Sequence, residues 1–153
     1  MPHVHFSRGH RATATAVPTT RRLRDRGLRA TRPRITILDF LIETEGHWDA
    51  GVIGEHARHQ LGTISLQAVY DVLDALTRTG LARRIEPMNR PALYESRVGD
   101  NHHHLVCNAC GRVDNLDCAA DMVPCLEPSQ DHGFEIDEAE VCWYGLCAAC
   151  ARS

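Results

Sequence analysis

Two Cys-x-x-Cys pairs constrain the folding of this 153-residue chain more than any other feature. The first pair is Cys107 and Cys110, and the second is Cys147 and Cys150. Two intervening residues let one turn present both thiolates to the same ion, and four thiolates complete the closed tetrahedral shell of a structural zinc site. We therefore expect one Zn²⁺ per subunit, which ties the second pair back to an earlier strand. Four ordinary thiols or two disulfides are the alternative.

Composition and charge indicate the cellular compartment of the protein and the kind of partner that it binds. No apolar run approaches the length of a membrane span and no signal peptide is visible, so we expect a cytoplasmic protein without a membrane partner. Seven cysteines in a reducing compartment indicate metal or redox chemistry. Residues 1–34 contain nine Arg and one Asp, whereas residues 99–153 contain two Arg and ten acidic residues. This polarity predicts a polyanionic partner for the first part of the chain only.

The first part of the chain has the pattern of a helix-turn-helix. Residues 1–20 lack apolar periodicity and are expected to form a disordered basic arm. A helical pattern with Pro33 in its first turn follows, and Asp49 is positioned to cap a second helix that ends at Gly62. A third helix is predicted to begin after its N-cap, Ser65. The short turn between the second and third helices is typical of a helix-turn-helix.

A predicted β-hairpin follows this motif. The segments 81–86 and 92–96 flank a turn with two prolines, so we assign residues 21–96 to a winged-helix DNA-binding domain. A plain helical hairpin is the alternative for the helices alone. In a winged helix the recognition helix lies in the major groove, and basic residues such as Arg90 are expected near phosphates. The residues expected to contact DNA are Arg34, Ser65, Gln67, Tyr70, Arg83 and Arg84.

The remainder has the pattern of a small α/β unit. Residues 97–101 are expected to form a hinge, and residues 102–153 a dimerisation and metal-binding domain with few apolar residues of its own. The expected elements are strands at 104–106, 112–116, 134–136 and 141–144, and a short helix over 119–126. The expected fold class is therefore α+β: a winged helix-turn-helix domain followed by a small α/β dimerisation domain with a structural zinc site.

Four motifs together resemble the ferric uptake regulator family: TRPR at 31–34, SLQAVYDVL at 65–73, HHHLVCNACG at 102–111 and YGLCAAC at 144–150. The resemblance extends over residues 21–150 and implies a dimeric, metal-dependent repressor with a winged-helix domain, a hinge and a dimerisation domain. The motifs ESRVGDNHHH at 95–104 and DEAEV at 137–141 resemble an actinobacterial branch of the family. Members of that branch are described as peroxide-responsive repressors of catalase-peroxidase genes and of their own genes.

The resemblance also implies a regulatory metal site with nitrogen and oxygen ligands, suited to Fe²⁺ or Mn²⁺ and also to Zn²⁺. The residues that match the family's ligands by position are His47, Glu95, His102 and His104. Strand alternation puts the last two histidines on one face and His103 on the other. Where relatives carry a further carboxylate, this chain has Asn115. We expect Asp117 to replace that carboxylate, ahead of Asn115 and Asp114.

We predict a homodimeric repressor that binds an inverted-repeat operator in double-stranded DNA and responds to peroxide or iron. By resemblance, ferrous iron at the regulatory site would reduce peroxide, and oxidation of a ligand histidine would release the DNA. The controlled genes would be those of a catalase-peroxidase and of the repressor itself. Redox sensing by Cys118 and Cys125 is one alternative, and iron- or zinc-sensing control of metal uptake is another. A non-haem iron enzyme is a third, but no cosubstrate motif is visible, so we expect neither an enzyme nor a small-molecule substrate.

Overall fold

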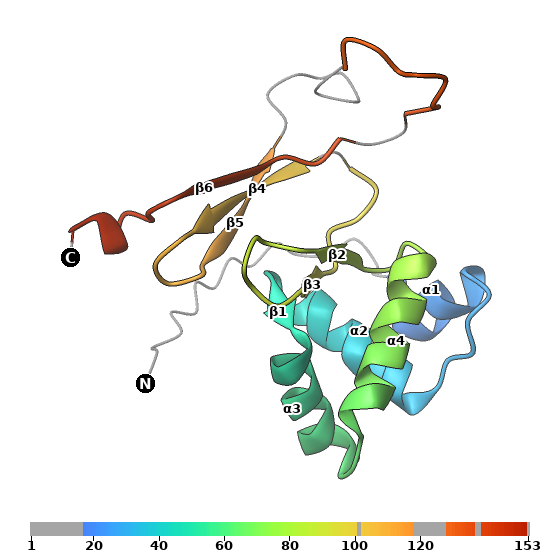
Figure 1. Cartoon of the computed structure of the whole chain (residues 1–153). Helices are drawn as coiled ribbons and strands as arrows, with labels where there is room; N and C mark the ends of the chain where they lie inside the picture. Colours follow the sequence, from blue (N-terminus) through green and yellow to red (C-terminus); the bar gives the residue numbers. More distant parts are fainter. Residues whose placement is uncertain (1–16, 101, 118–127, 137–138, 153) are drawn as a thin grey trace.

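The computed structural model describes residues 17–100, 102–117, 128–136 and 139–152, which form two units (Figure 1). The first unit contains the helices and a small three-stranded sheet. The second unit is built on a separate three-stranded sheet, which lies beside the first unit's sheet. This arrangement confirms the predicted α+β fold class.

The helix-turn-helix is defined by hydrogen bonds at its helix ends. Asp49 Oδ1 accepts hydrogen bonds from two backbone N–H groups in the following turn, at 2.7 and 3.0 Å, and Ser65 Oγ accepts one at 3.1 Å. Gly62 ends the second helix with a φ of +84°, a conformation that glycine adopts without strain. These ends confirm the predicted boundaries. The three helices are α2 (Arg32–Thr44), α3 (Ala50–Leu61) and α4 (Leu66–Arg78).

A further helix, α1 (Thr19–Asp25), precedes this motif and covers its core. It begins inside the segment that was predicted to be disordered, so Thr19 and Thr20 belong to the helix; residues 1–16 lie outside the described residues. None of the helices in the described part of the chain is long and apolar enough to cross a membrane. The largest core side chains of this unit are Leu23, Ile37, Leu38, Phe40, Leu41, Ile53, Val69, Leu73, Leu76 and Tyr94.

The wing is an antiparallel sheet with the strand order β1-β3-β2. Its strands are β1 (Trp48–Asp49), β2 (Arg83–Ile85) and β3 (Leu93–Glu95). The last two strands confirm the predicted hairpin, whereas β1 was not predicted because two residues cannot display an alternating pattern. Its register pairs Trp48 with Tyr94, which places His47, the residue before Trp48, opposite Glu95.

The second sheet has the strand order β5-β4-β6, with β5 antiparallel and β6 parallel to the central strand. Its strands are β4 (His102–Cys107), β5 (Val113–Asp117) and β6 (Cys142–Gly145). The predicted strand at 134–136 is wrong: these residues are exposed and make no ladder with the described strands, so their short apolar alternation buries nothing. The predicted helix over 119–126 lies outside the described residues.

The loop between β2 and β3 forms hydrogen bonds with the second unit. Met88 N–H donates to Tyr144 Oη at 2.9 Å, and Arg90 Nη2 donates to the carbonyl oxygen of Asn108 at 3.1 Å, in the turn of the first cysteine pair. Arg90 was predicted to approach DNA phosphates; within the chain, its guanidinium donates to the carbonyl oxygens of Cys107 and Asn108 in this turn. Gly111 has a φ of +79°, and a Cβ atom there would lie 2.2 Å from Arg90 Nη1, so a larger residue would strain this turn and displace the guanidinium.

The burial of α4 generates a prediction about stability. Leu76 is fully buried, whereas Leu66 on the same helix is 47% exposed. Leu76→Ala is expected to lower the free energy of unfolding of the first unit by about 2–5 kcal/mol, because it removes packed methyl groups and leaves a cavity. Leu66→Ala is the matched control and should cost well under half as much. Urea denaturation followed by circular dichroism measures both, and equal losses would contradict this packing of α4.

Candidate metal centres and DNA-binding surface

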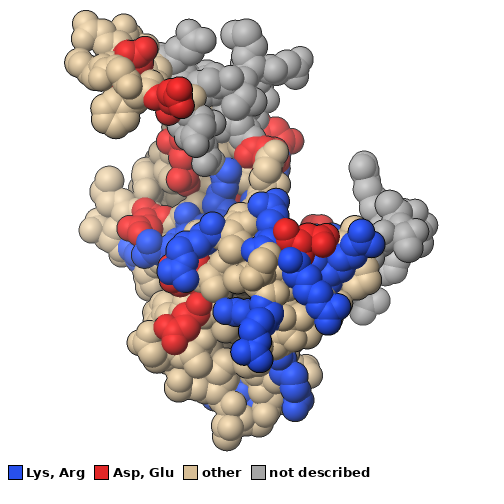
Figure 2. Space-filling view, turned by 90° about the vertical axis from the view of Figure 1, so that its right-hand side faces the viewer, with Lys and Arg blue, Asp and Glu red and all other residues tan. Residues whose placement is uncertain are grey.

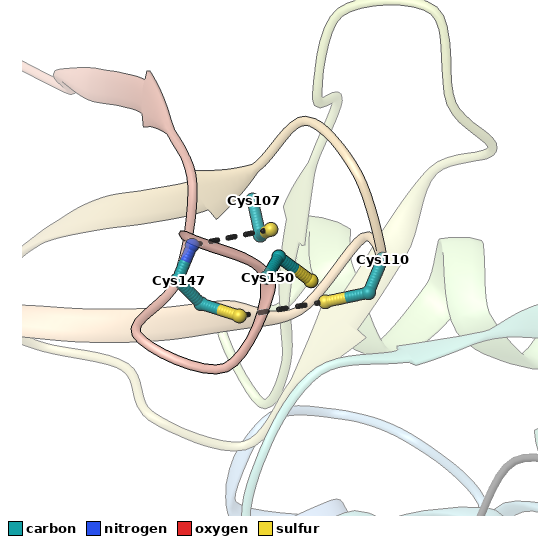
Figure 3. Close-up of side chains that lie close together, drawn as sticks. All are labelled: Cys107, Cys110, Cys147 and Cys150. Carbon is teal, nitrogen blue, oxygen red and sulfur yellow. Dashed lines mark hydrogen bonds between the residues drawn. The ribbon is translucent and has the colours of Figure 1, made fainter. Parts of the chain in front are cut away.

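The four cysteines of the two Cys-x-x-Cys pairs converge at one end of the second sheet (Figure 3). The parallel register of β4 and β6 pairs Cys107 with Gly145, so the turns that follow both strands lie side by side. The four sulfur atoms lie within 4.8 Å of one another, and Cys110 Sγ is 3.8 Å from Cys147 Sγ. Thiolates around one zinc ion stand about 3.8 Å apart, so the cluster has the span of a zinc site and not of disulfides. All four are free thiols.

The backbone around the first pair prepares this cluster for a cation. Cys147 N–H donates to Cys107 Sγ at 3.3 Å. The backbone N–H groups of Cys110 and Cys147 lower the pKa of the Cys107 thiol to about 6, because they stabilise its thiolate. The neighbouring sulfur atoms of Cys147 and Cys110 raise the pKa of Cys150 to about 12. One sulfur is therefore readily ionised while another keeps its proton, as expected where negative charges gather without a metal.

A second cluster surrounds the carboxylate of Glu95 at the junction of the two units. His102 Nε2 lies 2.8 Å and His104 Nε2 lies 3.3 Å from Glu95 Oε1. From the first unit, His47 Nε2 lies 3.4 Å from Glu95 Oε2. From β5 of the second unit, Asn115 Nδ2 donates to the same oxygen at 3.0 Å. Glu95 is 1% exposed and both strand histidines are fully buried. Helix-turn-helix, wing and second sheet therefore contribute to one buried polar cluster.

The chemistry of this cluster fits a divalent metal ion. Burial alone would raise the pKa of Glu95, but its contacts with His104, His47 and Asn115 hold that pKa well below its ordinary value. The carboxylate is therefore ionised at neutral pH. The buried Nε2 atom of His47 lies 3.4 Å from Glu95 Oε2 but makes no hydrogen bond of acceptable geometry within the described part of the chain. An orphaned imidazole nitrogen beside an ionised carboxylate is a donor set that suits Fe²⁺, Mn²⁺ or Zn²⁺.

The structure brings together four of the predicted regulatory residues, His47, Glu95, His102 and His104. Among the three candidates for a further ligand, the residue that lies nearest to this cluster is not the one that we favoured. Asn115 lies opposite His104 in the β4–β5 register and reaches Glu95. Asp117, which we favoured, is 83% exposed and accepts a hydrogen bond from Arg97 Nη2 at 2.6 Å. Asp114 is bound by Arg112, because strand alternation points it to the opposite face.

Two carboxylates behind the histidines were not predicted. Asp100 Oδ1 lies 2.8 Å from His102 Nδ1, and Glu140 Oε1 lies 3.2 Å from His104 Nδ1. Carboxylates commonly hold the second ring nitrogen of metal-binding histidines and fix the direction of the ring. The spacing of Asp100, two residues before His102, could have indicated the first contact; Glu140 depends on the β4–β6 pairing and has no local signal.

The predicted DNA-contacting residues all lie on the first unit, and they differ in whether their side chains already bind other groups of the chain. Gln67 and Tyr70 are exposed on the first turns of α4, and Gln67 Nε2 donates to Asp71 Oδ1. Ser65 is exposed, but its hydroxyl caps the helix. The three arginines are already engaged within the chain: Arg34 with the Arg29 carbonyl, Arg83 with the Asp100 carbonyl, and Arg84 with the Glu86 carboxylate. Arginine side chains gather over the helical unit on the face shown in Figure 2.

The possible redox thiols, Cys118 and Cys125, lie outside the described residues. The remaining cysteine outside the zinc quartet, Cys142, lies on β6 and is partly buried.

The fold, the cysteine cluster and the Glu95 cluster together define a class of protein: a winged-helix protein with candidate metal-binding residues at the junction of its two units. The profile of the ferric uptake regulator family matches residues 25–144, and the chain belongs to this family. It is a metal-responsive transcriptional regulator and not an enzyme. The transcriptional regulator FurA of Mycobacterium tuberculosis is 50% identical over 131 residues, which cover 86% of this chain and 88% of that protein.

Solved structures of the family have the same fold. The Helicobacter pylori ferric uptake regulator superposes with a TM-score of 0.67 at 17% identity, over 87% of this chain and 89% of that one. The Campylobacter jejuni peroxide stress regulator superposes with a TM-score of 0.63 at 27% identity, over 85% of this chain and 97% of that one.

The cysteine cluster generates a prediction about metal content. Cys110→Ser is expected to lose the tightly bound zinc and the folded structure of the second unit, because the metal supplies folding energy that this small sheet lacks. Zinc content after gel filtration and the circular dichroism spectrum are the measurements. Cys142→Ser is the matched control, since it removes a thiol outside the quartet and should retain one zinc per subunit. A folded Cys110→Ser protein without zinc would contradict a structural role.

Proposed function

We propose that this protein is a homodimeric, zinc-stabilised repressor that binds an inverted-repeat operator and releases it when peroxide reacts at the Glu95 cluster. The repressed genes would include that of a catalase-peroxidase and its own. The name of the Campylobacter jejuni peroxide stress regulator, at 27% identity, supports a peroxide response. A repressor of bacterial genes acts in the cytoplasm.

The observation that carries this proposal is the shared carboxylate of Glu95. His47 approaches it from the first unit, and His102 and His104 approach it from the second. A divalent ion bound by these residues would therefore link the DNA-binding unit to the second sheet. Because such an ion binds best when all ligands are within reach, it would select the relative position of the units that suits the operator.

The chain's own residues determine what happens at this site. His47, Glu95, His102 and His104 would hold Fe²⁺ or Mn²⁺, with Zn²⁺ as a further possible occupant, and four cysteines would hold the structural Zn²⁺. Bound ferrous iron, unlike manganese, would supply the electron that splits peroxide, and the net transfer of one oxygen atom from peroxide to an imidazole ring would leave water. The buried imidazoles are the nearest oxidisable groups, and an oxidised ring is a poorer ligand. Loss of one histidine would remove one of the ligands through which the metal joins the two units.

The second sheet supports dimerisation. Large apolar side chains on one face of it are partly exposed although the sheet is the core of its unit: Leu105, Leu116 and Trp143. Exposed apolar groups of this density are favourably buried against another protein surface. A second copy with twofold symmetry would place two recognition helices on two half-sites, which accounts for an operator with inverted repeats.

Removal of one ligand histidine tests the link between metal and DNA. His102→Ala is expected to keep the fold and the structural zinc but to lose the Mn²⁺-dependent increase in operator affinity, because it removes one of the two histidine ligands that the second sheet would offer to the metal. Fluorescence anisotropy with labelled operator DNA measures this. His103→Gln is the control: it keeps an acceptor for the Val141 N–H and lies on the opposite face of β4. Operator affinity in His102→Ala that equals that of the wild type would place the regulatory site elsewhere.

Peroxide chemistry is tested by peptide mass spectrometry after a brief peroxide pulse. The iron-loaded protein is expected to gain oxygen at His47, His102 or His104, and the manganese-loaded protein is not, because only the former metal reduces peroxide. Oxidation confined to Cys118 and Cys125 with either metal would move the switch to thiols. Unmodified protein in both cases would leave a plain metal sensor.

A further inference from the structure

His104 presents its two ring nitrogens to two different groups of potential ligands. Its Nε2 atom lies 3.3 Å from Glu95 Oε1, inside the cluster described above. Its Nδ1 atom points the other way, 3.2 Å from Glu140 Oε1. The side chain is fully buried, and Nδ1 makes no hydrogen bond of acceptable geometry within the described part of the chain. A buried nitrogen of this kind needs a proton acceptor or a cation.

The strand pairing brings a thiol to the same place. His104 is paired with Cys142 in the parallel register of β4 and β6, and Cys142 Sγ lies 4.0 Å from Glu140 Oε1. One donor atom from each of the three residues lies within 4.8 Å of the others. Ligands of a tetrahedral ion at bond lengths of about 2.0–2.3 Å stand about 3.3–3.8 Å apart, so only small movements would close this group around an ion. The Glu140 side chain is 39% exposed, which leaves access from solvent.

We propose that His104 Nδ1, the Glu140 carboxylate and the Cys142 thiolate form a second metal site that competes with the Glu95 cluster for His104. One nitrogen, one oxygen and one sulfur ligand suit Zn²⁺ and its substitute Co²⁺ and disfavour Mn²⁺. Binding releases the thiol proton of Cys142 to solvent. The existence of the site is independent of the proposed function, whereas its regulatory consequence rests on it.

Competition follows from the tautomers of a neutral imidazole, which has one lone pair on its two nitrogens. An ion on Nδ1 requires the proton on Nε2, where it donates to Glu95. An ion on Nε2 requires the proton on Nδ1, where it donates to Glu140. Each carboxylate thus accepts the proton while the other helps to bind the ion. Excess zinc on the thiol side would withdraw His104 from the regulatory ligands and weaken the hold of the Glu95 cluster on its own metal.

Cobalt titration of protein that carries zinc on its four cysteines tests the site. Thiolate-bound Co²⁺ gives a charge-transfer band in the near ultraviolet, which nitrogen and oxygen ligands alone do not give. We expect the band to grow to one Co²⁺ per subunit beyond the retained zinc. It should be lost in Cys142→Ser and strongly weakened in Glu140→Gln. It should persist in His47→Ala, which disables the Glu95 cluster but keeps every ligand of the second site.

Absence of the band in the wild type, or its persistence at full strength in Cys142→Ser with the zinc retained, would overturn the site. Competition is tested by adding saturating Mn²⁺. In the wild type the Co²⁺ concentration at the midpoint of the band should rise severalfold, and in His47→Ala it should not move. A midpoint that is unchanged in both proteins would overturn the shared use of His104. None of these readouts involves DNA or peroxide, so failure of the proposed function would be seen separately.

Discussion

The buried carboxylate of Glu95 is the group on which the relation between the two units depends. An ionised carboxylate that is 1% exposed is costly unless it is hydrogen-bonded or paired with a cation. Its contacts come from both units: His47 precedes β1, His102 and His104 lie on β4, and Asn115 lies on β5. Separation of the units would leave this charge without most of its partners. The cost of burying it is therefore offset only while the units are together.

The wing loop gives the same junction a second point of contact. Arg90 binds the carbonyl of Asn108, and Met88 binds the hydroxyl of Tyr144, so the wing rests on the turn that carries the first cysteine pair. A zinc ion bound to the four cysteine sulfur atoms would fix the shape of that turn. Structural zinc would therefore do more than stabilise the second sheet: it would hold the surface on which the wing is positioned. The position of the wing in turn fixes Glu95, which ends β3.

The sequence was sufficient where local physics determines the structure. Asp49 and Ser65 cap helices wherever the chain goes next, so the helix-turn-helix was predictable residue by residue. What could not be predicted depends on pairing between distant segments. Asn115 reaches Glu95 because of the β4–β5 register, and Asp117 is withdrawn by Arg97, twenty residues away. The sequence shows that Arg90 carries a guanidinium. Its contact with the Asn108 carbonyl depends on how the two units pack, which the sequence alone does not show.

Asn115 brings a neutral amide to Glu95 in the proposed regulatory cluster, and two carboxylates outside that cluster add negative charge nearby. Three neutral imidazoles and one carboxylate would bring a single negative charge to a divalent ion. Asp100 and Glu140 stand behind two of these imidazoles, at 2.8 and 3.2 Å from their Nδ1 atoms. Coulomb attraction falls with distance, so their direct effect on the ion is smaller than that of a ligand carboxylate.

Their indirect effect acts through the histidines. A carboxylate that accepts the Nδ1 proton makes the opposite nitrogen a stronger donor and fixes the direction of the ring. Negative charge is thus moved from the ligand shell to two partly exposed side chains, where solvent and other cations can reach it. In the proposed site Glu95 would be the single ligand carboxylate, so these two outer carboxylates would contribute to how firmly the metal is held. The strength of the proposed metal link between the units would therefore also respond to whatever binds those outer carboxylates.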